Sequence, residues 1–289
     1  MTENKKSKTA EILEMLKAGV ESVFESDAYK KYLEFVGKFR HYSWANTMLI
    51  MLQAPETRYV ASWSDWRNKF SRYVKKSAGN QRIRIIAPHT RKETDEHGND
   101  RIVVGFHAAT VYPIEATTPI GDSGEDIPEL CRPLCDDVDN FERLRDVLVD
   151  ISPVPVAFES FSSDAYGYYS PKELKIVIKD DIAEAQTIKT MMHEIAHSWL
   201  HCEGGECENA DRHEMETQAE SVAFAVASWL GLDTSTYSFE YLASWAKDRS
   251  LPELKSSLAI IQRTAVKMMD MIERRLEGEL HQGAATNAC

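Results

Sequence analysis

The sequence lacks long apolar runs and has few cysteines. Its longest apolar segment, Val222 to Leu232, is too short to span a bilayer and is interrupted by Ser228 and Gly231. The first nine residues are polar and lysine-rich, and no apolar segment follows them, so a secretory signal peptide is not expected. The five cysteines are an odd number, and their scatter does not suggest a disulfide framework. These absences predict a protein of the reducing cytoplasm with no membrane partner.

Acidic and basic residues are unevenly distributed along the chain. The net charge is −12, but residues 1–112 hold 19 Lys/Arg and 13 Asp/Glu, a net +6. Residues 113–289 hold 15 Lys/Arg and 33 Asp/Glu, a net −18. This split predicts two domains with different partners, and 289 residues suffice for both. The predicted linker is residues 113–139, which are rich in proline, glycine and acids.

The most specific motif is HEIAH, residues 193–197. On a helix, His193 and His197 share one face, so both imidazoles can reach one metal ion. Glu194 then lies beside the open coordination position, where it can take a proton from water and pass it to a leaving amine. This is the HExxH pattern of zinc peptidases. Because the pattern is short, a chance match on a surface helix is the alternative.

The neighbouring residues favour a helix that contains this motif. Asp181 is expected as the N-cap, with Glu184 three residues later. The residues that form an apolar stripe at helical spacing are Ile188, Met192, Ile195, Ala196 and Trp199. The motif is therefore predicted to lie inside an amphipathic helix.

A catalytic zinc site needs a third protein ligand and leaves its fourth position to water. The candidates are His201, the Cys202/Cys207 pair, Glu216 and Glu220. His201 lies about 12 Å along the helix from the first histidine, which is too far for one ion to bind both. The two cysteines would complete a closed structural site, in which the glutamate of the motif has no role.

Glu216 and Glu220 belong to a second predicted helix, which runs to about Leu230. They lie one turn apart on one face, where two carboxylates repel each other unless a cation is near. One could bind zinc while the other accepts the ring N–H of a ligating histidine. Glu216 is the preferred ligand, and a solvated acidic helix face is the alternative.

The segments HEIAHSWLH (193–201) and METQAESVAFAVASWLGLDTS (215–235) resemble the zincin domain of ArdC-type antirestriction proteins and of the related ImmA/IrrE metallopeptidases. The resemblance covers about residues 154–265. It implies a minimal gluzincin-like metallopeptidase domain at residues 140–289, with Zn²⁺ held by His193, His197 and Glu216. It also implies that Glu194 is the catalytic residue and that Glu220 supports a metal ligand.

Short strands are predicted in this domain at residues 154–158, 166–170 and 175–178. An edge strand directly before the HExxH helix would be the natural place for a peptide substrate to add as a further strand. The strands could equally serve only to support the helix. Residues 254–276 have helical periodicity with mixed charges and predict a packing helix.

Residues 58–92 contain ten basic residues and only one acid, Asp65. They could form a solvated surface, or they could follow a phosphate backbone with aromatic side chains as stacking platforms. Basic residues mixed with aromatics suit single strands, since stacking needs unpaired bases. The candidate contacts are Arg67, Lys69, Arg72, Lys75, Lys76, Arg82, Arg84, Trp44, Trp63, Trp66 and Tyr73. Trp44 and Trp66 could instead be core anchors.

The first part of the chain resembles the N-terminal domain of the same ArdC-like proteins over about residues 28–112. The resemblance rests on residues 32–35, 40–50, 54–63, 66, 74–76 and 83–88. It implies a single-stranded-DNA-binding domain at residues 1–112 and adds Asn46 and Arg58 to the candidate DNA contacts. The usual Gly-Glu-Lys-Gly turn after the paired lysines is here SAGNQR, residues 77–82, which departs from the family pattern.

The expected fold class is α+β in both domains. In the first, helices are expected near residues 9–25, 28–39 and 43–53, and strands near 83–87 and 102–112. The predicted function is a zinc metallopeptidase that acts on a protein or peptide and binds single-stranded DNA, associated with antirestriction or a mobile element. The alternative is a non-catalytic single-stranded-DNA-binding antirestriction factor whose zinc site is structural.

Overall fold

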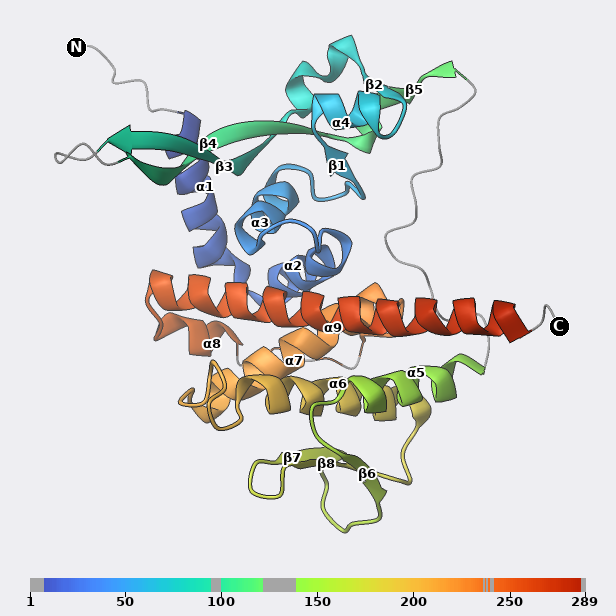
Figure 1. The fold of residues 1–289 in the computed structure, drawn as a ribbon. Helices are drawn as coiled ribbons and strands as arrows, with labels where there is room; N and C mark the ends of the chain where they lie inside the picture. The colour runs from blue at the N-terminus through green and yellow to red at the C-terminus, as the bar shows by residue number, and fades with distance from the viewer. Residues whose placement is uncertain are drawn as a thin grey trace. The chain divides into compact units, whose positions relative to one another are not determined.

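The computed structural model describes residues 8–94, 100–121, 139–235, 237, 239 and 242–286. The chain divides into two units, each of which is described by itself (Figure 1). Unit 1 comprises Met1–Val23 and His41–Leu130, and unit 2 comprises Phe24–Arg40 and Cys131–Cys289. Each unit combines helices with strands, which confirms the predicted α+β class.

Unit 1 contains two small sheets with helices beside them. Its elements are α1 (Lys8–Val23), α3 (Trp44–Gln53), β1 (Val60–Ala61), α4 (Trp63–Asn68), β2 (Arg72–Val74), η1 (Lys76–Gln81), β3 (Ile83–Thr94), β4 (Asp100–Pro113), η2 (Ile114–Ala116) and β5 (Thr117–Pro119). One antiparallel sheet has the order β1-β4-β3, and β2 pairs with β5 in the other. The predicted helices near 9–25 and 43–53 are present, and both predicted strands are longer than expected.

Two side-chain amides attach α3 to the open edge of β3. The Asn46 amide donates to the Ile86 carbonyl at 2.9 Å and accepts from the Ile86 N–H at 2.8 Å. Gln53 makes the same pair of bonds with the backbone of Arg84, both at 2.9 Å. These amides replace a neighbouring strand, because they satisfy backbone groups that an edge strand leaves unpaired.

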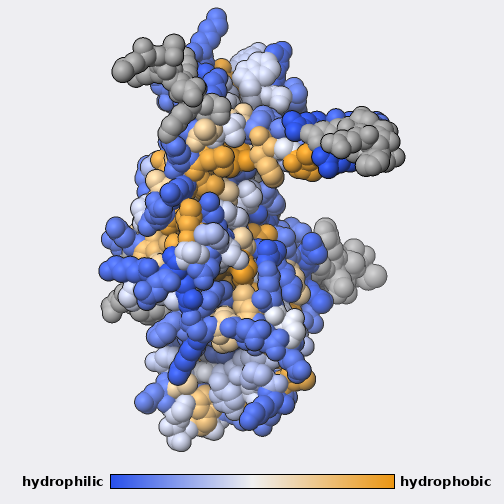
Figure 2. Space-filling model, turned by 90° about the vertical axis from the view of Figure 1, so that its left-hand side faces the viewer, coloured by the Kyte–Doolittle hydropathy of each residue, from blue (hydrophilic) through white to orange (hydrophobic). Residues whose placement is uncertain are grey.

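The β3–β4 hairpin has an exposed apolar face. Ile102, Val104 and Phe106 alternate along β4 and are 70%, 57% and 62% exposed. Alternate residues of a strand point to the same side, so these three side chains share one face. Figure 2 shows hydrophobic patches, coloured orange, on a largely hydrophilic surface.

Unit 2 is a helical stack on a three-stranded sheet. Its elements are α2 (Ser26–Lys38), α5 (Asp139–Ile151), β6 (Val156–Glu159), β7 (Gly167–Ser170), β8 (Lys175–Lys179), α6 (Glu184–Leu200), α7 (Arg212–Trp229), α8 (Leu242–Lys247) and α9 (Leu251–Thr286). The sheet packs on α6, α6 packs on α7, and α7 contacts α2 and α9 (Figure 1). Across the described ranges, no helix is both long enough and apolar enough to cross a membrane.

The sheet of unit 2 has the order β6-β8-β7, with β6 parallel and β7 antiparallel to β8. The strand directly before α6 is therefore central, which corrects the expectation that it is an edge strand. β8 pairs on both edges, with β6 and with β7, and its consecutive residues Ile176, Val177 and Ile178 are fully buried, so both of its faces are covered as well. The edge strand beside α6 is β7.

Residues 24–40 join unit 2, although the sequence placed them in a first domain of residues 1–112. The Tyr29 hydroxyl lies 2.8 Å from the Ser221 hydroxyl of α7. Gly37 lets α2 approach α7 closely, since a Cβ there would lie 3.2 Å from the Trp229 Cβ. At the other boundary, η2 and β5 extend unit 1 into the predicted linker, residues 113–139. Residues 122–138 of that linker lie outside the described residues.

Substituting Asn46 by alanine should expose the importance of the α3–β3 amide contacts. Asn46→Ala removes both partners of the Ile86 backbone, and the unsatisfied groups should cost about 1–3 kcal/mol of stability. Hydrogen–deuterium exchange should accelerate in the β3 peptide that contains Ile86. The control is Asn80→Ala, at an exposed position of η1. Equal β3 exchange in both variants would contradict this role.

Candidate metal centre

Helix α6 begins later than the sequence suggests, and α7 begins earlier. The N-cap of α6 is Ala183, without a side-chain hydrogen bond, so the prediction of Asp181 as the cap is wrong. The chain is still leaving the sheet there, since the Asp180 N–H donates to Glu159 at the end of β6. Helix α7 begins at Arg212, because Asp211 caps it by accepting from the Glu214 N–H at 2.9 Å.

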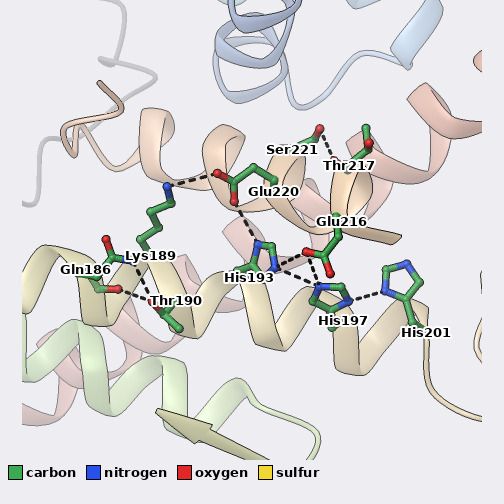
Figure 3. Close-up of polar contacts among 10 residues, drawn as sticks. All are labelled: Gln186, Lys189, Thr190, His193, His197, His201, Glu216, Thr217, Glu220 and Ser221. Atoms are coloured by element: carbon green, nitrogen blue, oxygen red, sulfur yellow. Dashed lines mark hydrogen bonds and ion pairs between the residues drawn. The ribbon is translucent and has the colours of Figure 1, made fainter. Parts of the chain in front are cut away.

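The two helices bring three potential metal ligands together (Figure 3). His193 and His197 project from α6, and their Nε2 atoms lie 3.0 Å apart. Glu216 projects from α7, with one carboxylate oxygen 3.4 Å from the His193 Nε2 and 3.7 Å from the His197 Nε2. One potential ligand atom from each of the three residues lies within 4.8 Å of the other two. Two imidazole nitrogens and one carboxylate oxygen suit a divalent transition metal.

Glu220 lies one turn after Glu216 and contacts the other nitrogen of His193. Its carboxylate is 3.1 Å from the His193 Nδ1 and 3.2 Å from the Lys189 ammonium. A carboxylate only accepts, so it holds the ring proton of His193 on Nδ1. The other ring nitrogen of His193, Nε2, faces Glu216 and His197.

The electrostatics of the cluster favour a cation. Burial opposes protonation of His193, but hydrogen bonds to Glu216 and Glu220 outweigh it and raise the His193 pKa to about 9. Hydrogen bonds with His193 and His197 hold the pKa of Glu216 well below its usual range. Burial would raise the pKa of Glu220, but its contacts with His193 and Lys189 leave that pKa lowered. Ionised carboxylates therefore surround nitrogens that attract positive charge, and a metal ion satisfies both.

Glu194 stands apart from the three potential ligands. Its side chain is 8% exposed, and burial raises its pKa despite the opposing effect of His193. The Tyr169 N–H of β7 donates to its carboxylate. A buried carboxylate with a raised pKa, held by a backbone donor, can exchange a proton near neutral pH more readily than an exposed one.

A cleft of about 480 Å³ opens beside this cluster. Its walls are formed by Tyr166, Gly167, Gln186, Lys189, Thr190, His193, Glu194 and Glu220. The sequence reasoning did not single out Gln186, Lys189 or Thr190. The signal was available, because Lys189 and Gln186 precede His193 by one and two helical turns on the same face.

Comparison with known proteins bears on the fold and the family. The model of the family described as "Putative metallopeptidase family (DUF6782)" matches residues 107–246. The crystal structure of the antirestriction ArdC protein from the R388 plasmid, in its metal-free form, has a TM-score of 0.55 at 18% identity. The match covers 81% of this chain and 85% of that one. The chain is ArdC-like in fold, with a metallopeptidase-like domain.

Two further comparisons bear on this likeness. The Mn(II)-bound crystal structure of the same ArdC protein gives a TM-score of 0.52 at 16% identity, over 80% of this chain and 83% of that one. An uncharacterized protein of Bacillus anthracis is 23% identical over 312 residues, covering 94% of this chain. This ArdC-like chain spans only 52% of the length of that relative.

The other candidate ligands lie outside the cluster. The His201 Nδ1 is 2.9 Å from the His197 Nδ1, behind the ring edge that faces Glu216. Burial lowers the pKa of His201 to about 4. Cys202 and Cys207 are free thiols, and neither joins the ligand group found within the described ranges.

Two of the candidate DNA contacts in unit 1 are buried, which corrects their predicted role. Trp66 is 0% exposed, and its indole N–H donates to the Tyr112 carbonyl at 2.9 Å. Asn46 is 9% exposed and is committed to the backbone of β3. Neither side chain can stack on or contact a base. Trp63 and Tyr73 are 52% and 51% exposed, whereas Trp44 is half-buried.

Most of the candidate basic residues have partners within unit 1. The pairs are Lys69 with Asp65, Arg84 with Glu11, Arg72 with Thr117, Lys75 with the Glu115 backbone, Arg82 with the Gly79 backbone, and Arg67 with the Trp63 ring. Arg58 and Lys76 are exposed and have no partner in the described part of the chain. These two cations are the ones most available to an anionic ligand.

A substitution at Gly167 should test the close contact between β7 and α6. A Cβ there would lie 2.6 Å from the Thr190 Cγ2 and 2.9 Å from the Val177 carbonyl oxygen. Gly167→Ala should therefore lower the stability of unit 2 by about 1–3 kcal/mol, as expected for overpacking. Thermal unfolding measures the loss. Gly79→Ala is the control, since a Cβ there meets only the Arg82 side chain at 3.8 Å.

Adding Thr190→Ser to Gly167→Ala removes the clashing Cγ2 and should recover part of the lost stability. If Gly167→Ala proves as stable as Gly79→Ala, the close contact has no energetic role.

Proposed function

We propose that unit 2 is a zinc-dependent peptidase in which His193, His197 and Glu216 hold the metal. The observation that carries this proposal is the position of Glu194. This carboxylate is buried and lines the cleft together with His193, yet it is not one of the three grouped ligands. A purely structural site would have no use for it, whereas hydrolysis needs a base at that position.

The metal, Glu194 and Glu220 would have different roles in hydrolysis. When bound, Zn²⁺ supplies a Lewis acid that polarises a carbonyl and makes a nearby water more acidic. The Glu194 carboxylate accepts a proton from the attacking water and then donates it to the leaving amine. Its raised pKa suits both transfers. Glu220 orients His193 and raises its basicity as a ligand.

The edge of β7 offers a binding site for an extended peptide. The Lys179 N–H donates to the Tyr166 carbonyl, so the backbone groups of alternate residues, Gly167 and Tyr169, face away from β8. Tyr169 uses its N–H for Glu194, and Gly167 lines the cleft. A substrate added as a strand beside Gly167 would run past Glu194 and the metal ligands.

We further propose that unit 1 binds single-stranded DNA. The support is the ArdC-like fold together with exposed Trp63 and Tyr73 and the unpaired cations Arg58 and Lys76. Arg67, Lys69, Arg72, Lys75, Arg82 and Arg84 would add positive charge around them. Aromatic platforms beside cations suit unpaired bases. The substrate would then be a cytoplasmic protein found on DNA, in an antirestriction or mobile-element setting.

A second candidate is a non-catalytic single-stranded-DNA-binding antirestriction factor with a structural zinc site. The likeness in fold to ArdC, which is described as an antirestriction protein, favours it. The two candidates differ in whether the effect of the protein on DNA requires Glu194.

Glu194→Gln tests the peptidase. The amide cannot accept a proton from water, so cleavage of a protein or peptide-library substrate should fall by at least about 100-fold, the usual contribution of a general base. Zinc content, measured by elemental analysis, should remain at one ion per chain. Glu184→Gln, at an exposed position in the first turn of α6, is the control. Undiminished cleavage by Glu194→Gln would rule out this mechanism.

Charge reversal at Lys75 and Lys76 tests DNA binding. Lys75→Glu/Lys76→Glu should weaken binding of a labelled single-stranded oligonucleotide, and the dependence of log affinity on log salt should fall by about one unit or more. Fluorescence anisotropy at several salt concentrations gives both values, with duplex as the comparator. Lys172→Glu, an exposed lysine of unit 2, is the matched control. Unchanged affinity and salt dependence would exclude this surface.

A further inference from the structure

A chain of buried polar side chains lies behind His197, on the side away from Glu216. The His197 Nδ1 is 2.9 Å from the His201 Nδ1 (Figure 3). The His201 Nε2 is 3.0 Å from the Gln218 Oε1, and the Gln218 amide donates to Glu214 at 3.2 Å. His201 is 9% exposed and Gln218 is 0% exposed, so water does not compete for these bonds.

The chemistry of these groups fixes where each proton lies. The Glu214 carboxylate only accepts, so it orients the Gln218 amide with its oxygen toward His201. That oxygen also only accepts, so His201 carries its proton on Nε2 and presents a lone pair at Nδ1. The bond between the two Nδ1 atoms then places a proton on the His197 Nδ1. The lone pair of His197 is left on Nε2, which faces His193 and Glu216.

We propose that His201 and Gln218 are positioning residues that lock His197 in the tautomer able to bind metal through Nε2. The inference rests on the proposed function, in which His197 is a ligand. The Nδ1 proton of His193 is held by Glu220. The Nδ1 of His197 contacts His201 instead of a carboxylate. The hydrogen-bonded series Glu214–Gln218–His201 therefore holds the Nδ1 proton of His197 over a longer distance.

The opposite arrangement of protons shows why Gln218 matters. Without a fixed acceptor at Nε2, His201 could carry its proton on Nδ1 and donate it to His197. The His197 proton would then lie on Nε2 and would occupy the metal-binding position. The orientation of one buried amide therefore selects between a binding and a non-binding imidazole.

Nuclear magnetic resonance of the full-length, metal-free chain tests this directly. Long-range proton–nitrogen correlation in protein labelled with ¹⁵N-histidine distinguishes the two tautomers, and loss of a signal in His197→Gln assigns the ring. We expect His197 to be protonated on Nδ1 in the unaltered chain. A ring protonated on Nε2 would overturn the proposal, whatever the variants do.

Variants then test the link to metal affinity. His201→Leu and Gln218→Met should each weaken Zn²⁺ binding by about 10–100-fold, the usual effect of losing a partner that orients a ligand. Chelator competition measures the affinity. His201→Gln keeps an acceptor for the His197 Nδ1–H and should recover most of it. Thr187→Val, another buried polar position of α6, should bind zinc as the unaltered chain does.

The outcomes separate this inference from the proposed function. If the unaltered protein binds no zinc, the peptidase proposal fails. The tautomer measurement still decides whether His201 and Gln218 position His197. If the unaltered protein binds zinc and folded His201→Leu binds it equally well, the positioning role of His201 and Gln218 is refuted. If His201→Leu does not fold, Gln218→Met supplies the same comparison, and equal affinity there also refutes it.

Discussion

The contact between α6 and α7 determines the geometry of the candidate centre. Each helix presents polar side chains one turn apart, His193 and His197 on one, Glu216 and Glu220 on the other. Where the helices pack, these pairs interleave at 3.1–3.7 Å. The two carboxylates would repel each other on an isolated helix, and the imidazoles of the facing helix give them partners. The sheet packs on α6, and α2 and α9 pack on α7, so the rest of unit 2 holds the two helices in this pairing.

That pairing also explains the separate position of Glu194. It follows His193 directly in the sequence, so its side chain projects about 100° around the helix from that histidine. The ligands therefore face α7 while Glu194 faces β7, where the Tyr169 N–H receives it. A substrate on the free edge of β7 would consequently meet the base and the metal ligands from one side. Gly167 makes this arrangement possible by letting strand and helix approach within contact distance.

Much of the centre could be predicted from sequence because helical spacing alone sets which side chains share a face. His193, His197, Glu216 and Glu220 lie together, as expected. Features that depend on distant packing could not be read in this way. The interior position of Trp66, the use of Asn46 as a substitute strand partner and the central place of β8 are each set by segments far along the chain. The same holds for α2, whose apolar face is buried against α7 in unit 2.

The two histidines of the motif are supported in chemically different ways, and the charge of the site depends on the difference. A carboxylate at the Nδ1 of His193 strengthens that ligand but adds a negative charge. A second carboxylate behind His197 would bring four acids around two imidazoles and reduce the power of a bound cation to polarise a carbonyl. The neutral His201–Gln218 pair fixes the ring without that charge and moves the carboxylate of Glu214 outward, where it lies 3.7 Å from Arg249. The charge next to the two imidazoles therefore comes from Glu216 and Glu220, while the support behind His197 is neutral.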